Sequence, residues 1–248
     1  MTMLAVDTSY LFCAAKVAKA AGQHDQAMTF LDQLLAVDPS HAPAQRMRNL
    51  LFDWPQTPFT YTRVVDFLLS KNMGFNDQFV VLENLIRKYG LRVGVELGVL
   101  YGYHAQHLVE ACPNLFLYGA DAFHKLRPGN GYDEVTQEWF DALCAKTRGH
   151  LESTGRWELL RATTTDAAHS FSRVVDFVFV DADHGYEGVR DDIEAWWDRV
   201  RPGGIVSGHD FDQPEWPGVK QAVEECLGKR DLVPTLDYGY VWWVRKPR

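Results

Sequence analysis

The sequence predicts an α/β protein in which a doubly wound, mainly parallel sheet of seven strands follows an N-terminal α-helical extension. Two patterns carry this prediction. The first fifty residues are rich in alanine and leucine with helical spacing, whereas after Gly90 short apolar runs alternate with helical patterns. Buried strands that alternate with helices indicate a parallel sheet that is covered on both faces.

The N-terminal segment is expected to be helical over residues 8–52, with breaks at Gly22 and at residues 38–40. Apolar residues between positions 27 and 35 recur every three or four residues and predict one buried helical face. The pattern resembles the second half of a tetratricopeptide repeat. Because only one copy is present and such solenoids need about three, a helical hairpin that caps the main domain or pairs two subunits is favoured.

Two prolines in residues 53–58 predict a linker after this hairpin. We therefore expect a helical hairpin and linker over residues 1–55 and an α/β domain over residues 56–248. Residues 62–90 return to a helical pattern that ends at a glycine. If the hairpin pairs two subunits, the protein forms a homo-oligomer through its N-terminal helices.

Seven apolar runs are expected to form the strands of the sheet. They are residues 93–97, 115–120, 157–160, 174–180, 205–207, 232–236 and 240–244. The last two runs flank a turn sequence and predict a hairpin whose final strand is inserted antiparallel. Because ligands of doubly wound sheets bind outside the carboxyl ends of the strands, the residues after each strand are the candidate site residues.

The first strand leads into the turn Glu96-Leu97-Gly98-Val99-Leu100-Tyr101-Gly102. Two glycines allow the backbone to turn sharply and approach a ligand, although a simple strand-to-helix turn has the same pattern. The spacing is neither GxGxxG nor GxxxxGK[ST], which disfavours dinucleotide and P-loop sites. Asp121 ends the second strand, where nucleoside-binding proteins of this class place a carboxylate for the ribose hydroxyls. A helix N-cap is the alternative role for Asp121.

Two further strand ends carry six titratable side chains. They are Asp181, Asp183, His184, His209, Asp210 and Asp212. Such a group in one cleft would repel strongly unless a cation, a proton or a substrate neutralised it. Because these residues follow buried strands, a solvated surface cluster is the less favoured interpretation.

Two loops are candidate rims of this site. Residues 123–140 form a polar, glycine-containing insertion that is expected to close over a substrate, and residues 212–218 form a second rim. Their aromatic side chains Phe123, Tyr132 and Trp216 would either stack on a sugar or another ring, or face solvent.

These residues resemble the motifs of class I S-adenosylmethionine-dependent methyltransferases, which have a Rossmann-like fold. The Glu96–Gly102 turn is similar to their first motif, and Pro202-Gly203-Gly204 is similar to the turn before their fifth strand. The signature Asp181-x-x-His184-x-Tyr186 resembles that of a subfamily with metal-dependent sugar O-methyltransferases. The resemblance covers about residues 75–245 of the chain.

The resemblance implies S-adenosyl-L-methionine as the cofactor, together with a divalent cation. The implied cofactor-binding residues are Glu96, Gly98, Gly102, Asp121, Thr163, Thr164 and Asp181. The implied metal ligands are Asp181, His209 and Asp210, and the implied catalytic residues are Asp181 and His184, the latter as general base. A histidine departs from the usual acidic or amide ligands, so Mn²⁺, Fe²⁺ and Zn²⁺ are alternatives to Mg²⁺. In the other alternative, His209 points away and Asp210 or Asp212 coordinates the ion.

The chemistry supports His184 independently of the resemblance. An alcohol is a poor nucleophile at neutral pH, and a positioned base contributes roughly 10²–10⁴ in rate. The alternative for His184 is a loop histidine that caps the next helix. We therefore expect methyl transfer to a hydroxyl of a small molecule, with a sugar or a glycosylated natural product as the first candidate by analogy.

Other functions fit parts of the same pattern. A metal-free N-methyltransferase or a hydroxylase-like relative would keep the fold, and a non-catalytic adaptor would carry a degenerate methyltransferase domain. A nicotinamide oxidoreductase ranks last. The net charge of −8 disfavours nucleic acid and anionic membranes as partners. Without a signal peptide or an apolar run of about 20 residues, and with four scattered cysteines, a cytoplasmic protein is expected.

Overall fold

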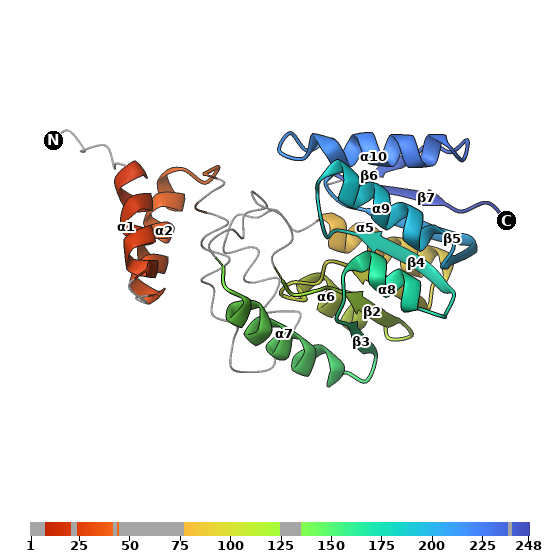
Figure 1. Ribbon diagram of the computed structural model, residues 1–248, viewed down its shortest axis with the longest axis horizontal. Coiled ribbons are helices and arrows are strands. Elements are labelled where there is room, and N and C mark those ends of the chain that lie inside the picture. Colours follow the sequence, from red (N-terminus) through yellow and green to blue (C-terminus); the bar gives the residue numbers. More distant parts are fainter. Residues whose placement is uncertain (1–7, 21–23, 42–43, 45–76, 125–134, 238–239) are drawn as a thin grey trace. The chain divides into compact units, whose positions relative to one another are not determined.

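The computed structural model describes residues 8–20, 24–41, 44, 77–124, 135–237 and 240–248 (Figure 1). The helix expected after residue 42, the proline-containing linker and the middle of the insertion after Asp121 lie outside these residues. The chain divides into two compact units, Met1–Thr57 and Pro58–Arg248, and each is described by itself.

The first unit contains two antiparallel helices, α1 (Thr8–Ala20) and α2 (His24–Val37). The buried apolar side chains of this unit are small or aliphatic and come from both helices and from Ala44, which follows α2. They are Leu11, Ala15, Ala27, Leu31, Leu34 and Ala44. The two helices confirm the helical prediction for this segment, whereas the tetratricopeptide resemblance stays a prediction.

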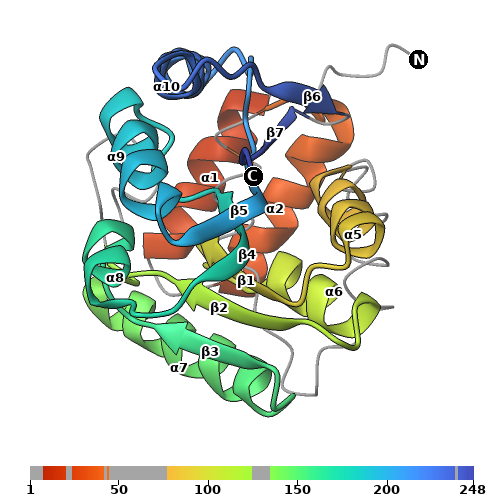
Figure 2. The same cartoon turned by 90° about the vertical axis from the view of Figure 1, so that its right-hand side faces the viewer.

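The second unit is built on a seven-stranded sheet with the order β3-β2-β1-β4-β5-β7-β6 (Figures 1 and 2). The strands are β1 (Val93–Leu97), β2 (Phe116–Ala120), β3 (Trp157–Leu160), β4 (Val175–Val180), β5 (Val200–Gly208), β6 (Thr235–Asp237) and β7 (Val241–Arg245). Strands β1 to β5 pair in parallel, and β7 runs antiparallel between β5 and β6. The predicted α/β class and the antiparallel insertion of the last strand are confirmed.

Helices cover both faces of this sheet. They are α5 (Asp77–Tyr89), α6 (Tyr103–Ala111), α7 (Gln137–Glu152), α8 (Thr164–Ser170), α9 (Tyr186–Trp197) and α10 (Pro217–Gly228). Figure 2 shows α8, α9 and α10 on one side of the sheet and α5 and α6 on the other. The core on the first side includes the fully buried Trp196 of α9 and Trp242 of β7. Among the described residues, no helix combines the length and the apolar character that crossing a membrane requires.

The sequence prediction was wrong about the start of β5. The Pro202-Gly203-Gly204 stretch, expected to be a turn, lies inside a strand that begins at Val200. Gly203 has a φ of +75°, and the pairing register with β4 shifts in this region. Hydrogen bonds from Gly203 N to Lys246 O and from Lys246 N to Gly204 O, both 2.9 Å, continue the pairing with the end of β7. The glycines therefore form an irregularity within the strand, like a β-bulge, rather than end it.

Candidate functional site

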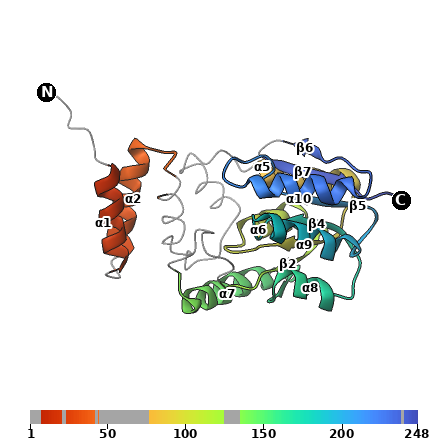
Figure 3. The same ribbon diagram turned by 45° about the horizontal axis from the view of Figure 1, so that its top comes forward.

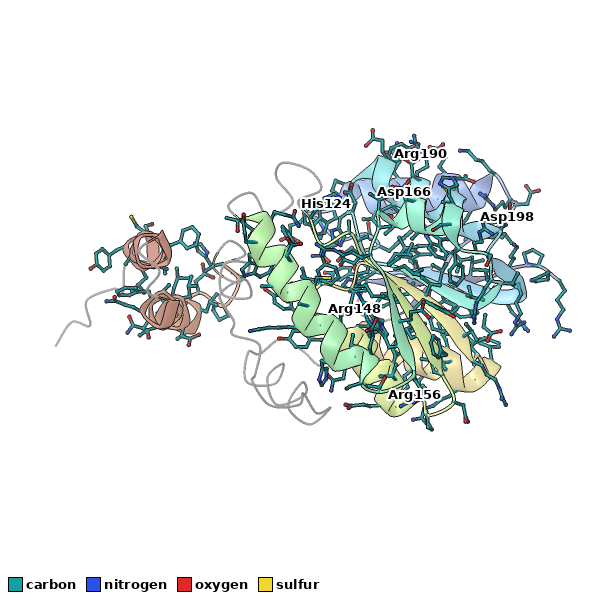
Figure 4. All side chains as sticks on the ribbon, turned by 60° about the horizontal axis from the view of Figure 1, so that its bottom comes forward. His124, Arg148, Arg156, Asp166, Arg190 and Asp198 are labelled. Atoms are coloured by element: carbon teal, nitrogen blue, oxygen red, sulfur yellow. The ribbon has the colours of Figure 1, made fainter. Side chains whose placement is uncertain are left out.

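The carboxyl ends of the parallel strands lie at one edge of the sheet. Figure 4 shows His124, which follows the carboxyl end of β2, and Asp198, which precedes the amino end of β5. The two residues mark the two opposite ends of the parallel strands. The candidate residues Gly98, Asp121, Asp181 and Asp210 all follow strands at the edge that His124 marks.

The glycine turn after β1 is packed tightly against the end of β4. Gly98 has a φ of +84°, and a Cβ atom there would lie 2.1 Å from the carbonyl oxygen of Asp181. Gly102, with a φ of +73°, precedes α6, and a Cβ there would lie 2.8–2.9 Å from Leu151 and Thr147 of α7. Both positions therefore require glycine for backbone conformation and packing. This supports the tight-turn interpretation and leaves the cofactor role of the two glycines a prediction.

Asp121 holds the loops on either side of it. Its Oδ2 atom accepts the backbone N–H groups of Val99 and Leu100, each at 2.9 Å, and its Oδ1 atom accepts that of Phe123 at 2.7 Å. Leu100 and Phe123 both have positive φ values, 47° and 48°, which are unfavourable for these residue types. The carboxylate therefore stabilises two strained residues, and it retains acceptor capacity for one further donor.

Glu96 is buried at the centre of the sheet edge, where its Oε1 atom lies 2.9 Å from Nδ1 of His104. Burial and the negative charges of Asp181 and Asp121 raise the pKa of Glu96 well above its usual value. Burial also lowers the pKa of His104 to about 3, so its imidazole is neutral at pH 7. Glu96 Oε2 has no hydrogen-bond partner among the described residues. His104 was not predicted from the sequence, where its only signal is its position in the first turn of the helix after the glycines.

Thr163 and Thr164, which the resemblance implies as cofactor contacts on the adenine side, have structural roles at the start of α8. The Thr163 hydroxyl caps the helix by accepting the N–H of Asp166 at 3.1 Å. The Thr164 hydroxyl donates to the carboxylate of Asp192 on α9, and Trp196 Nε1 donates to the Thr164 carbonyl at 2.9 Å. These bonds tie the loop after β3 to α9, and an adenine contact stays a prediction.

The hydrogen bond between Thr164 and Asp192 can be tested through the pH dependence of protein stability. Burial raises the pKa of Asp192 to about 7, although its hydrogen bond from Thr164 opposes the shift. A carboxyl group whose pKa is higher in the folded than in the unfolded protein stabilises the fold fully at a pH below its unfolded-state pKa. This contribution is lost as the pH rises through its folded-state pKa. The variant Asp192→Asn keeps the acceptor for Thr164 but does not ionise. We expect its melting temperature, relative to wild type, to rise between pH 5 and pH 8, by an amount that corresponds to about 1–3 kcal/mol.

The control for this prediction is Asp191→Asn. Asp191 is the neighbouring residue, and half of its side chain is exposed. Its substitution should leave the difference from wild type nearly constant over the same pH range. A flat profile for Asp192→Asn would contradict the buried, raised-pKa carboxyl group.

Four of the six titratable residues at the ends of β4 and β5 converge. His184 Nε2 lies 2.8 Å from Asp210 Oδ2 and 3.4 Å from Asp181 Oδ1. His209 Nδ1 lies 3.0 Å from Asp210 Oδ1 and 3.9 Å from Asp181 Oδ1. One ligand atom each from Asp181, His184 and Asp210 lies within 4.8 Å of the others, a group that could hold a metal ion. This group contains the predicted ligands Asp181 and Asp210 together with His184, the predicted base, whereas the predicted ligand His209 is not part of it.

The carboxylates determine the charge of the two imidazoles. Burial opposes protonation of His184, but hydrogen bonds with Asp181 and Asp210 outweigh it and raise the pKa of His184 to about 10. The same balance raises the pKa of His209. Burial would raise the pKa of Asp210, yet its bonds with both histidines hold it well below its usual value. The two carboxylates therefore favour the protonated form of both imidazoles.

The other two acidic residues of the predicted group lie outside this cluster. Asp183 accepts the N–H of Gly185 at 2.9 Å, and the exposed Asp212 pairs with Lys220 at 3.0 Å. The sequence pattern could not separate them, because all six residues follow strands within a few positions.

Of the predicted rim aromatics, Trp216 stacks on His184 with 4.9 Å between ring centroids and 29° between planes. The expectation that Phe123 stacks on a substrate or faces solvent is wrong, because this side chain is 1% exposed. Tyr132 lies outside the described residues.

The comparisons with known proteins agree with this geometry. Residues 95–211, from β1 to the end of the Asp/His cluster, match the family model described as a methyltransferase domain. This segment resembles a methyltransferase. Its match contains the glycine turn, Asp121 and all four clustered residues. Among curated proteins, no sequence matches the chain.

Solved structures of methyltransferases share the fold. A TDP-rhamnose 3'-O-methyltransferase of calicheamicin biosynthesis is 20% identical, with a TM-score of 0.50 over 84% of this chain and 94% of its own. The O-methyltransferase NovP is 17% identical, with a TM-score of 0.54 over 69% and 80%. An O-methyltransferase from Bacillus cereus, solved in complex with SAH, is 18% identical, with a TM-score of 0.51 over 84% and 99%. At these identities the likeness concerns the fold.

Proposed function

We propose that the protein transfers the methyl group of S-adenosyl-L-methionine to a hydroxyl oxygen of a small molecule. The observation that carries this proposal is the cluster of Asp181, His184, His209 and Asp210 at the carboxyl ends of β4 and β5. It lies within the segment that matches a methyltransferase domain. An alcohol needs help to lose its proton, and this cluster contains the groups that can provide it.

The charge at the strand ends fits a cationic cofactor. The buried carboxyl group of Glu96 interacts unfavourably with Asp121 and Asp181, and its Oε2 atom has no hydrogen-bond partner among the described residues. S-adenosylmethionine carries a sulfonium and an ammonium group, whose positive charges would reduce this repulsion. Glu96 and the glycine turn would hold the methionine part, Asp121 the ribose, and the Thr163–Thr164 segment the adenine side.

The donor set also fits a divalent cation. Asp181, Asp210 and His184 lie close enough together to offer two carboxylate oxygens and a nitrogen, and His209 Nδ1 lies 3.0 Å from Asp210 as a second imidazole. Such a set suits Mn²⁺, Fe²⁺ or Zn²⁺ and accommodates Mg²⁺ less well. We propose that Asp181, Asp210 and His209 hold the ion and that His184 remains free to act as base. A bound cation would lower the pKa of a substrate hydroxyl and hold it in place.

His184 is the group that takes the proton of the acceptor. Its raised pKa depends on Asp181 and Asp210, so its imidazole becomes a base only when the charge of these carboxylates is offset. The stacked Trp216 ring keeps the imidazole plane in place. In the reaction, the acceptor oxygen forms a bond to the methyl carbon, the bond from this carbon to sulfur breaks, and the hydroxyl proton passes to His184 Nε2.

A sugar hydroxyl is the first acceptor to test. One structural neighbour is a TDP-rhamnose 3'-O-methyltransferase, which suggests TDP-rhamnose as a probe. Catechol serves as a second probe because its adjacent hydroxyls can both approach a metal ion. An amine acceptor tests the alternative of a metal-free N-methyltransferase.

The first experiment measures transfer of a labelled methyl group to these probes by wild type, His184→Ala and His169→Ala, with and without a chelator. His169 is exposed on α8 and serves as the control. We expect loss of His184 to lower the rate about 10²–10⁴-fold, with His169→Ala unchanged and the chelated enzyme inactive. Full activity of both His184→Ala and the chelated protein would overturn the metal-and-base mechanism. If calorimetry detects no binding of S-adenosylmethionine, the adaptor alternative is favoured instead.

The second experiment separates the roles of the two histidines through the affinity for Mn²⁺, measured by electron paramagnetic resonance. If His209 is the ligand, His209→Ala weakens Mn²⁺ binding by about 10–100-fold, whereas His184→Ala leaves it nearly unchanged. The reverse result would make His184 the ligand and would exclude it as the base.

A further inference from the structure

The edge of the sheet opposite the candidate active site carries a group of arginines around one glycine. Gly203 lies near the start of β5 and pairs with Lys246, just beyond β7. Because β7 is antiparallel to β5, its end meets the beginning of β5, and Figure 3 shows the C-terminus beside β5. The surface is therefore formed by the start of β5 and the residues after β7. It is separate from the Asp/His cluster, which lies at the other end of β5.

Three guanidinium groups approach Gly203. Arg245 Nε donates to the Gly203 carbonyl at 3.1 Å. Arg201 Nη1 and Arg248 Nε each lie 3.7 Å from the position that a Cβ atom would take on Gly203. These two arginines therefore flank the space that a side chain at position 203 would enter, and the positive φ of Gly203 disfavours any other residue there.

The positive charge at this point exceeds the negative charge. Asp176 is the carboxylate that contacts the group, and its Oδ1 atom accepts from Arg201 Nε. Its Oδ2 atom is occupied by the backbone N–H groups of Arg92 and Val93, at 2.6 and 2.9 Å. Among the described residues, Asp176 pairs with one of the three arginines, Arg201, in a chain whose net charge is −8. Gathering like charges in this way is unfavourable without a counter-ion.

Two of the three arginines are held in place before any ligand binds. Asp176 orients Arg201, whose side chain remains 40% exposed. Arg245 is held by the Gly203 carbonyl and by the ring of Tyr89, whose centroid lies 5.0 Å from the guanidinium carbon. Arg245 and Arg248 are exposed. A ligand would therefore find N–H donors that lose little conformational freedom on binding.

We propose that Arg201, Arg245 and Arg248 form a binding site for a phosphate group at the edge of the sheet remote from the active site. The planar guanidinium group matches the oxygens of a phosphate and can bind two of them at once. The negative charge of the phosphate group would add to that of Asp176 and offset the three guanidinium charges. This proposal is independent of methyl transfer, because none of its residues belongs to the Asp/His cluster.

The test is calorimetric titration of the full chain with inorganic pyrophosphate, in a chloride buffer of constant ionic strength. The double variant Arg245→Gln/Arg248→Gln removes two of the three guanidinium groups. The matched control, Arg148→Gln/Arg190→Gln, changes the net charge equally but affects helix-surface pairs with Glu152 and Asp191. We expect the affinity to fall about tenfold or more in the first variant and less than about twofold in the control. If the double variant is unstable, the single variant Arg248→Gln, at an exposed residue, replaces it. We expect this variant also to lower the affinity for pyrophosphate.

An equal loss of affinity in both double variants would overturn the proposal, because it would reflect net charge alone. Absence of pyrophosphate binding to wild type would also overturn it. A second arm uses sedimentation with phosphatidylglycerol and phosphatidylcholine vesicles to identify the source of the phosphate. If wild type binds pyrophosphate, arginine-dependent binding to the phosphatidylglycerol vesicles and not to the phosphatidylcholine vesicles would support the site and identify a lipid headgroup. Pyrophosphate binding without vesicle binding would support it and identify a soluble phosphate compound.

Discussion

Asp210→Asn is expected to weaken Mn²⁺ binding by about 100-fold or more and to lower methyl transfer by about 10²–10⁴-fold. Asp210 makes the shorter contacts with His184 and His209, at 2.8 and 3.0 Å, and its side chain is 8% exposed. The amide removes one negative charge and replaces an acceptor oxygen by a donor, so at least one imidazole loses its partner. Electron paramagnetic resonance of Mn²⁺ measures the first effect without knowledge of the acceptor.

Asp212→Asn is the matched control for this variant. Asp212 lies two residues further along, also has a positive φ (64° against 59° for Asp210), and is 67% exposed in its side chain. Asparagine tolerates this conformation as well as aspartate does, so neither substitution adds backbone strain. If both variants bound Mn²⁺ as wild type does, Asp210 would not be a ligand and the metal-assisted mechanism would lose its central residue.

Gly98→Ala is expected to destabilise the second unit by about 3–5 kcal/mol and to abolish binding of S-adenosylhomocysteine. The added Cβ would lie 2.1 Å from the Asp181 carbonyl oxygen and 2.7 Å from Ala182 Cα. These are backbone atoms at the end of a central strand, so relief of the clash must displace the start of the Asp/His cluster. The positive φ of Gly98 adds a further cost of about 1 kcal/mol for alanine.

Gly149→Ala provides the control in the same unit. Gly149 lies in α7, and a Cβ there would meet no atom within 4 Å. Alanine should therefore stabilise the helix by about 0.5–1 kcal/mol, which raises the midpoint of urea unfolding. If Gly98→Ala unfolded at the wild-type midpoint and still bound S-adenosylhomocysteine, the close packing of the glycine turn on β4 would be wrong.

The sheet could be predicted because its strands are short apolar runs with local boundaries. Residues 93–97 and 157–160 were predicted with the observed limits of β1 and β3, since apolar and polar residues change sharply there. The Pro-Gly-Gly sequence at residues 202–204 misled the prediction. Composition alone indicates a turn, but hydrogen bonds to residues near 246, distant in sequence, keep these residues within β5.

The candidate site was predicted in part. Asp121, Asp181, His184 and Asp210 could be selected as candidate site residues because each follows a predicted strand. The carboxyl ends of parallel strands lie at the same edge of the sheet. Position after a strand was not enough to assign their roles. Asp121 is engaged with three backbone N–H groups, and His184 lies against both carboxylates rather than apart from them.

The sequence by itself determined the α/β class, the antiparallel last strand and the edge at which the titratable residues gather. These follow from local hydrophobic patterning and from the geometry common to all parallel sheets. Only the tertiary structure decided which side chains meet. The Glu96–His104 pair, the Thr164–Asp192 link and the arginines around Gly203 depend on contacts between separate elements. Such contacts are set by packing distances and burial, which a linear pattern of residue types does not encode.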